Sequence, residues 1–315
     1  MISHFEKIIK AKGVVILDGA LATELEKKGA NLNHALWSAK LLIENPAYIK
    51  QVHLDYLHAG ADIITTATYQ ASFEGFAKEG YTKKETEDLM NLSLTLAMEA
   101  VDEFLKTSPS GNRQAPLVAA SIGPYGAALA DGSEYRGNYN VSIERIIEFH
   151  KDRLELLAKS NADILAFETI PCLEEALAIK ELLKKYPQRQ AWVSFSCKDE
   201  AHLCSGALFA EAIELLNESP NIIAVGVNCT APEYIESLIK IAAPITNKYI
   251  VVYPNKGELY NSLSKTWEPS SKCFIPFLDN AKIWKTAGAK LIGGCCRTSP
   301  AEIQLLKNYW KQPIT

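Results

Sequence analysis

The sequence predicts a single α/β domain over residues 1–315, folded as a (β/α)8 barrel of the TIM type. Short apolar runs alternate with longer helical patterns along the whole chain, and no Pro/Ser-rich linker divides it. Continuously apolar strands are typical of a parallel sheet that is covered on both faces. Repeated strand–helix units in a chain of 315 residues fit one barrel. An open, doubly wound sheet is the structural alternative.

Each predicted strand is a short apolar run that ends near a turn signal. In chain order these runs are Val14–Ala20, Ala61–Tyr69, Leu117–Pro124, Ala162–Ile170, Gln190–Cys197, Ile222–Thr230, Tyr249–Asn255 and Lys290–Cys296. Apolar residues at three- and four-residue steps predict helices between them, over Lys84–Lys106, Ile143–Ser160, Leu173–Lys185 and Pro232–Ala242. Two long connections, Asn31–Ile43 and Gly123–Val141, are expected to be loops on the functional face.

Composition excludes several classes of function. The net charge is −4 with mixed signs throughout, so there is no basic stripe for nucleic acid and no polybasic membrane patch. The N-terminal residues lack a secretory signal pattern, and a cytoplasmic protein with small-molecule ligands is expected. Seven cysteines without secretory context favour metal binding or catalysis over a disulfide framework.

Two adjacent cysteines, Cys295 and Cys296, follow Gly293-Gly294 at the end of the last strand. In a regular strand they would point to opposite faces, and the glycines permit a departure from that geometry. Ser299-Pro-Ala-Glu302 then predicts a helix start with a capping box. Cys229 occupies a similar strand-to-helix turn, before a second predicted capping box, Thr230-Ala-Pro-Glu233. Three thiols in such turns suit an open zinc site, which takes three protein ligands and leaves one position free.

Other strand ends carry further candidates, because barrels place their active sites at the C-terminal ends of the strands. Asp18 follows the first strand and Glu168 the fourth, although either acid has a purely structural alternative, as a turn stabiliser or an ion-pair partner. Buried cysteines often serve as small hydrophobes, which is the interpretation adopted for Cys197 and Cys204. No histidine is assigned to the metal. A redox role for the adjacent pair is disfavoured, since a disulfide between neighbours is strained.

With these residues in view, the sequence resembles the homocysteine S-methyltransferase family over nearly its whole length. The shared motifs are Asp18-Gly-Ala20, Gly226-Val-Asn-Cys229, Tyr253-Pro-Asn255 and Gly293-Gly-Cys-Cys296. The resemblance implies a (β/α)8 barrel, with Zn²⁺ bound by Cys229, Cys295 and Cys296. It also implies that Asp18 and Glu168 hold the amino group of homocysteine. Asn228 and Thr169 are expected to line the same substrate site.

Comparison with the branches of that family narrows the choice of methyl donor. The chain is too short for the folate and cobalamin modules of large methionine synthases. The betaine-using branch resembles it at Trp37 but has tyrosines where Gln70 and Thr169 stand here, so the cage for a quaternary ammonium is incomplete. S-methylmethionine is therefore the expected donor, with S-adenosylmethionine weaker or equal. Trp37, Tyr69, Gln70 and Asn255 form the candidate donor site.

The resulting hypothesis is a zinc-dependent transfer of a methyl group from a sulfonium to homocysteine, giving methionine. A free thiol has a pKa of roughly 8.5, and zinc favours its nucleophilic thiolate. Asp18 and Glu168 would orient the substrate. The alternatives are a betaine-dependent enzyme, an enzyme that methylates selenocysteine or another thiol, and a non-catalytic zinc- or thiol-sensing barrel.

Overall fold

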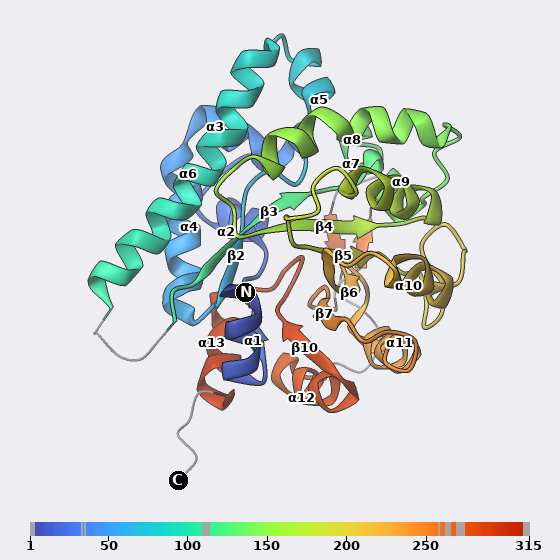
Figure 1. Ribbon diagram of the computed structural model, residues 1–315. Helices are drawn as coiled ribbons and strands as arrows, with labels where there is room; N and C mark the ends of the chain where they lie inside the picture. Colours follow the sequence, from blue (N-terminus) through green and yellow to red (C-terminus); the bar gives the residue numbers. More distant parts are fainter. Residues whose placement is uncertain are drawn as a thin grey trace.

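Eight parallel strands form one sheet that nearly closes into a barrel, with helices around it (Figure 1). The computed structural model describes residues 4–32, 34, 36–108, 114–257, 259–261, 266–268 and 275–310. The strands are β1 (Val15–Ile16), β2 (Ile63–Thr65), β3 (Leu117–Ile122), β4 (Ile164–Ile170), β5 (Ala191–Phe195), β6 (Ile222–Asn228), β7 (Tyr249–Tyr253) and β10 (Ala289–Ile292). Their order is β1-β10-β7-β6-β5-β4-β3-β2, which confirms the predicted fold class.

The seam between β1 and β2 is joined by a few backbone contacts just beyond the strands. Leu17 and Ile63 form a parallel bridge, and the Asp18 amide donates to the Ile63 carbonyl at 3.1 Å. The Asp62 amide donates to the Ile16 carbonyl at 2.6 Å. These contacts hold Leu17 and Asp18, which follow β1, against β2 at the mouth of the barrel.

Helices separate successive strands as the periodicity predicts. Their bounds are α1 His4–Lys12, α2 Leu21–Lys27, η1 Trp37–Lys40, α3 Leu41–Glu44, α4 Pro46–Ala59, α5 Phe73–Lys78, α6 Lys83–Thr107, α7 Tyr125–Leu129, η2 Ser133–Tyr135, α8 Ile143–Ala158, α9 Leu173–Leu183, α10 Phe209–Asn217, η3 Pro232–Tyr234, α11 Ile235–Ala242, α12 Phe277–Ala287 and α13 Pro300–Trp310. The four predicted helices are confirmed as α6, α8, α9 and η3 with α11.

The barrel interior is packed with apolar side chains at its N-terminal end. Helix α1 contributes Phe5, Ile8 and Ile9 to a cluster with inward-facing strand residues such as Leu117 and Trp192. Because α1 directly precedes β1, it covers the end at which the strands begin. The C-terminal ends of the strands are left for the functional site, as in other barrels of this type.

The two capping predictions had different outcomes. The Ser299 amide and hydroxyl both donate to Glu302 Oε2, at 2.8 and 2.7 Å, where α13 begins. The prediction at Thr230 is wrong, because η3 begins at Pro232 after Ala231 and has no side-chain cap. The Thr230 hydroxyl instead donates to the Asn228 carbonyl at 3.0 Å and accepts from the Cys197 amide at 2.9 Å. A bond across to the neighbouring strand has displaced a local cap.

The connections also differ in part from expectation. The segment Gly123–Val141, predicted to be a loop, contains α7 and η2. An antiparallel pair, β8 (Leu259–Asn261) and β9 (Thr266–Glu268), follows β7 and was not predicted from the sequence. Its strands are three residues each, too short for an alternating pattern to be distinctive.

Gly226 provides a test of the β6–β7 register. A Cβ atom at this position would lie 1.8 Å from the Val251 carbonyl oxygen, and the two residues are paired across the ladder. Gly226→Ala is expected to lower the free energy of unfolding by more than about 3 kcal/mol, because a backbone atom must move. The control is Gly13→Ala, which meets nothing within 4 Å but has a φ of +67°. It should cost about 1–2 kcal/mol. Urea denaturation of both variants measures the difference, and equal losses would contradict the steric argument.

Candidate metal centre and active site

A cavity of about 290 Å³ opens at the C-terminal ends of the strands. Its floor comes from strand ends and its walls from α2, the segment around η1, and the segment between α7 and η2. The chemically capable lining residues include Asp18, Glu26, His34, Trp37, Thr65, Tyr69, Gln70, Ser121, Asp131, Glu134, Glu168, Thr169, Asn228, Cys229, Tyr253, Cys295 and Cys296. The cavity thus gathers nearly all of the residues predicted from strand ends.

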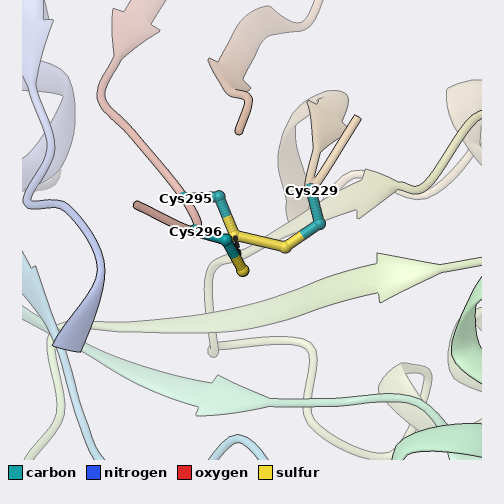
Figure 2. Close-up of side chains that lie close together, drawn as sticks. All are labelled: Cys229, Cys295 and Cys296. Carbon is teal, nitrogen blue, oxygen red and sulfur yellow. Dashed lines mark hydrogen bonds between the residues drawn. A yellow bond between two sulfur atoms is a disulfide. The ribbon is translucent and has the colours of Figure 1, made fainter. Parts of the chain in front are cut away.

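Three cysteine sulfurs meet on one side of this cavity (Figure 2). The Sγ atoms of Cys229, Cys295 and Cys296 all lie within 4.8 Å of one another. The structure joins Cys229 and Cys295 as a disulfide, and Cys296 Sγ lies 4.0 Å from Cys295 Sγ. Among the described residues, this is the group of His, Cys, Asp and Glu side chains that is arranged to hold a metal ion.

The backbone is distorted at both turns that carry the cysteines. Cys229 has a φ of 47°, in the left-handed region that side-chain-bearing residues rarely adopt. A Cβ atom on Gly294 would lie 2.2 Å from Thr298 Oγ1, so the turn before Cys295 closes only with glycine there. The Cys295 amide donates to the Pro254 carbonyl at 2.8 Å, and the Cys229 amide to the Tyr253 carbonyl at 3.3 Å. Both turns are therefore fixed against the end of β7.

The trio fits a tetrahedral metal ion in its reduced form. A Zn–S bond is roughly 2.3 Å, so thiolates on one ion lie roughly 3.8 Å apart, close to the 4.0 Å between Cys295 and Cys296. Reduction of the Cys229–Cys295 disulfide is required before both sulfurs can serve as ligands. Burial raises the pKa of the Cys296 thiol to about 12. A cation is therefore needed to hold this group as a thiolate at neutral pH.

Asp18 and Glu168 are two buried carboxylates on the cavity floor. Asp18 accepts bonds from the Thr65 amide at 2.7 Å and the Thr65 hydroxyl at 3.0 Å, while the Ser121 hydroxyl donates to Glu168. Burial raises the pKa of Asp18 to about 8, and the neighbouring Glu168 adds to this effect. Burial likewise raises the pKa of Glu168 to about 7. A bound cation would stabilise the ionised form of both groups.

Thr169 and Asn228 form a clamp between β4 and β6. Thr169 has a φ of 60°, and its amide donates to Asn228 Oδ1 at 2.7 Å. Asn228 Nδ2 donates to Thr169 Oγ1 at 2.8 Å, and the Ser194 hydroxyl donates to Asn228 Oδ1 at 2.8 Å. The Asn228 amide therefore fixes the strained turn directly after Glu168. Its side chain supports the site through this turn as well as lining the cavity.

Comparisons with known proteins agree with this geometry. The family model described as homocysteine S-methyltransferase matches residues 15–309. The chain belongs to the homocysteine S-methyltransferase family. It is 51% identical to the homocysteine S-methyltransferase YbgG of Bacillus subtilis, over 95% of both chains. It is also 43% identical to a selenocysteine Se-methyltransferase of Brassica oleracea, over 96% of this chain and 90% of that one.

A solved structure of the same family shows the same fold. The crystal structure of the homocysteine methyltransferase MmuM from Escherichia coli, in its metallated form, matches with a TM-score of 0.87 and 42% identity. The match covers 97% of this chain and 99% of that chain. The cysteine cluster, together with this metallated relative, supports a metal site in the present member of the family.

The predicted donor residues are only partly brought together. Trp37 and Tyr69 lie edge to face with ring centroids 6.0 Å apart, and Gln70 Nε2 donates to the Ala127 carbonyl at 2.8 Å. These three residues line the cavity, whereas Asn255 is absent from its described lining. The Asn255 amide donates to the Thr230 carbonyl at 3.1 Å. The Tyr-Pro-Asn motif thus contributes to the turn beneath the metal centre.

Several polar residues of the site were not predicted from the sequence, and Thr65, Ser121 and Glu134 are the most informative of them. Thr65 and Ser121 hold the two acids, and each is a small polar residue near the end of an apolar run, a signal that was available. Glu134 lines the cavity from η2, and burial raises its pKa to about 7. A charged residue in a long polar segment carries no distinctive sequence signal. Its position depends on how that segment folds.

In the part of the chain that the structure describes, the other cysteines and histidines lie outside the metal cluster. Cys197 and Cys204 do not line the cavity in the described chain. His53 is buried in α4, where burial lowers its pKa to about 4 and keeps the ring neutral. No helix in the described ranges is long and apolar enough to cross a membrane.

Stability of the metal-free protein should depend on pH through Asp18. Its folded-state pKa, about 8, lies above the ordinary value of 3.8, so the folded state binds more protons between these values. The contribution of Asp18 to the free energy of unfolding is therefore complete below about pH 4. It is lost as the pH rises towards 8, by up to roughly 1.4 kcal/mol per pH unit for one proton. Asp18→Asn should flatten this slope. Urea unfolding at pH 5.5 and 8 tests the expectation, and parallel slopes for both proteins would contradict it.

Proposed function

We propose that this enzyme uses a zinc ion, bound by Cys229, Cys295 and Cys296, to transfer a methyl group from a sulfonium to homocysteine. The products would be methionine and the demethylated donor. The observation that carries the proposal is the convergence of three thiols and two buried acids in one cavity. A zinc ion held by the three thiols would bind the sulfur of homocysteine, and the two acids would bind its ammonium group.

Zinc is the metal that this donor set favours. Thiolates are soft ligands, and tetrahedral sulfur sites select zinc over magnesium or calcium. Three protein ligands are typical of a catalytic zinc site, whereas a structural site is usually closed by four. Bound zinc would supply Lewis acidity that favours the thiolate form of the substrate. The open position argues against a barrel that senses zinc or thiols without turnover.

Asp18 and Glu168 are proposed to bind the ammonium group of homocysteine. Both side chains are buried and face the cavity, and burial is the main cause of their raised pKa values. A positively charged ligand would favour the ionised form of both carboxylates and would be attracted to them. Thr65 and Ser121 hold the two carboxylates, and the Thr169–Asn228 clamp fixes the backbone after Glu168. Positioning of this kind contributes strongly to rate, since small displacements of reacting groups cost about 100-fold.

S-methylmethionine is the proposed donor, with S-adenosylmethionine weaker or equal. Trp37 and Tyr69 supply two aromatic faces, but Gln70 and Thr169 leave the remaining positions without rings. A compact sulfonium can approach its acceptor with partial aromatic contact, whereas a quaternary ammonium loses cation–π stabilisation. Selenocysteine as the acceptor is the second candidate, favoured by the likeness to the Brassica Se-methyltransferase.

Loss of a proposed ligand should abolish metal retention. Reduced wild-type protein is expected to hold about one zinc per chain, and alanine at Cys229, Cys295 or Cys296 should reduce this to near zero. Cys204→Ala is the control, because Cys204 is half-buried and lies outside the cluster. Elemental analysis measures the metal, and circular dichroism checks that the fold persists. A folded Cys296→Ala protein with full zinc content and activity would refute the proposed site.

A donor and acceptor panel tests the reaction itself. With homocysteine, S-methylmethionine should give methionine, and S-adenosylmethionine should give it at an equal or lower rate. Betaine should be at least roughly 30-fold poorer in kcat/KM, because one desolvated cation–π contact is worth about 2 kcal/mol. Mass spectrometry of the products measures each rate. Faster turnover of betaine than of both sulfonium donors would contradict the proposed donor class, and selenocysteine outcompeting homocysteine would change the acceptor.

A further inference from the structure

Glu134 is a further acid of the cavity, and neither the proposed metal site nor the proposed homocysteine site uses it. It belongs to η2 in the segment between α7 and α8. Its Oε2 atom is buried and has no hydrogen-bond partner among the described residues. A buried carboxylate oxygen without a partner is costly, since it has lost water and gained nothing in return. This oxygen is therefore placed for a group that a ligand brings.

The backbone of Glu134 is held in place by its surroundings. The Ser196 hydroxyl, just beyond β5, donates to the Glu134 carbonyl at 3.1 Å. Gly126 allows the close approach of α7, because a Cβ atom there would lie 2.5 Å from the Glu134 amide nitrogen. The Gly137 amide donates to the Ser133 carbonyl at 2.8 Å and closes the turn. The carboxylate is thus presented by a fixed turn.

The ligand group that suits this carboxylate is a cation. The described lining of the cavity contains Asp18, Glu26, Asp131, Glu134 and Glu168 but no lysine or arginine. The nearby Arg136 is occupied on its own turn, where it donates to the Asp131 carbonyl at 3.0 Å and to Ser133 Oγ at 3.0 Å. A cavity whose described lining carries several acids and no lysine or arginine concentrates positively charged ligands.

The position of Glu134 places it on the donor side of the cavity. Glu134 lines the cavity together with Trp37, Tyr69 and Gln70, which form the proposed donor wall. Gln70 Nε2 donates to the Ala127 carbonyl at 2.8 Å, directly after Gly126, which closely approaches the Glu134 amide. Asp18 and Glu168 already serve the ammonium of homocysteine in the proposed function. The methyl donor, which carries both a sulfonium and an ammonium, is the substrate left to pair with Glu134.

We propose that Glu134 binds the cationic methyl donor through its carboxylate and makes the enzyme selective for donors with a net positive charge. The inference rests on the proposed methyl transfer. The shared chemistry is an organic cation, supplied either by the sulfonium or by the ammonium of S-methylmethionine. In both cases the contact opposes zwitterionic betaine, whose own carboxylate would be repelled by the acidic wall.

Two charge-removing variants with opposite expectations test this inference. Glu134→Gln should raise the KM for S-methylmethionine roughly 10- to 100-fold, as expected for loss of a charged hydrogen bond, with the KM for homocysteine within about twofold. Glu168→Gln should do the reverse. Glu148→Gln, an exposed acid on α8, is the control for net charge and should leave both values unchanged. The zinc content of Glu134→Gln should equal that of the wild type, and its urea midpoint should not fall below the wild-type value.

A second donor separates the two sources of positive charge. Dimethyl(propyl)sulfonium keeps the sulfonium but lacks the ammonium and the carboxylate. A similar loss with this donor assigns the contact to the sulfonium, and a loss confined to S-methylmethionine assigns it to the ammonium. An unchanged donor KM in Glu134→Gln, or an equal rise in both KM values, would overturn the inference while leaving methyl transfer intact. A wild-type enzyme that produces no methionine from any sulfonium would instead overturn the proposed function, and this inference with it.

Discussion

The convergence of three thiols is the constraint on which the rest of the site depends. Cys229 and Cys295 are 66 residues apart, and their sulfurs meet only because both turns leave regular geometry. A left-handed backbone at a residue other than glycine costs about 1–3 kcal/mol and persists only where the surroundings enforce it. Here the enforcement comes from neighbouring strand ends, and the Gly294 amide also donates to the Asp18 carbonyl at 3.1 Å. Asp18, proposed to bind the acceptor, is therefore fixed by the same turn that carries two of the proposed metal ligands.

The site also gathers several buried acidic groups whose charged forms need a positive partner. Burial raises the pKa of Asp18, Glu168, Glu134 and Cys296, so ionisation of each is disfavoured until a positive partner arrives. The proposed metal ion and the ammonium and sulfonium groups of the proposed substrates would be such partners. The cavity is thus complementary to positively charged ligands, and its buried acids lower the stability of the fold when those ligands are absent. Fixed dipoles and charges that need no rearrangement during reaction are the usual source of enzymatic electrostatic stabilisation.

The parts of this structure that follow from local sequence could be predicted, and the parts set by tertiary contacts could not. The barrel strands are continuous apolar runs that end near turn signals, and all eight are found. Thr230 looked like a helix cap, but its hydroxyl bonds across to Cys197. Asn255 matched a family motif yet lies outside the described cavity lining. The position of Glu134 in the cavity could not be predicted from the sequence, because it depends on contacts with Gly126 and Ser196.

The proposed donor side of the cavity is supported by a separate buried network of hydrogen bonds. Arg153, fully buried in α8, donates to the Gly123 carbonyl at 2.6 Å and the Ala71 carbonyl at 3.1 Å, next to the donor wall. Glu175 accepts from the Tyr125 amide at 2.6 Å and from the Tyr139 hydroxyl at 2.8 Å, on either side of Glu134 in the chain. Buried charges are tolerated when such bonds satisfy them. Because strand ends carry the proposed acceptor site and these anchored connections carry the proposed donor site, we expect changes in the connections to alter donor choice while the cysteine turns stay unchanged.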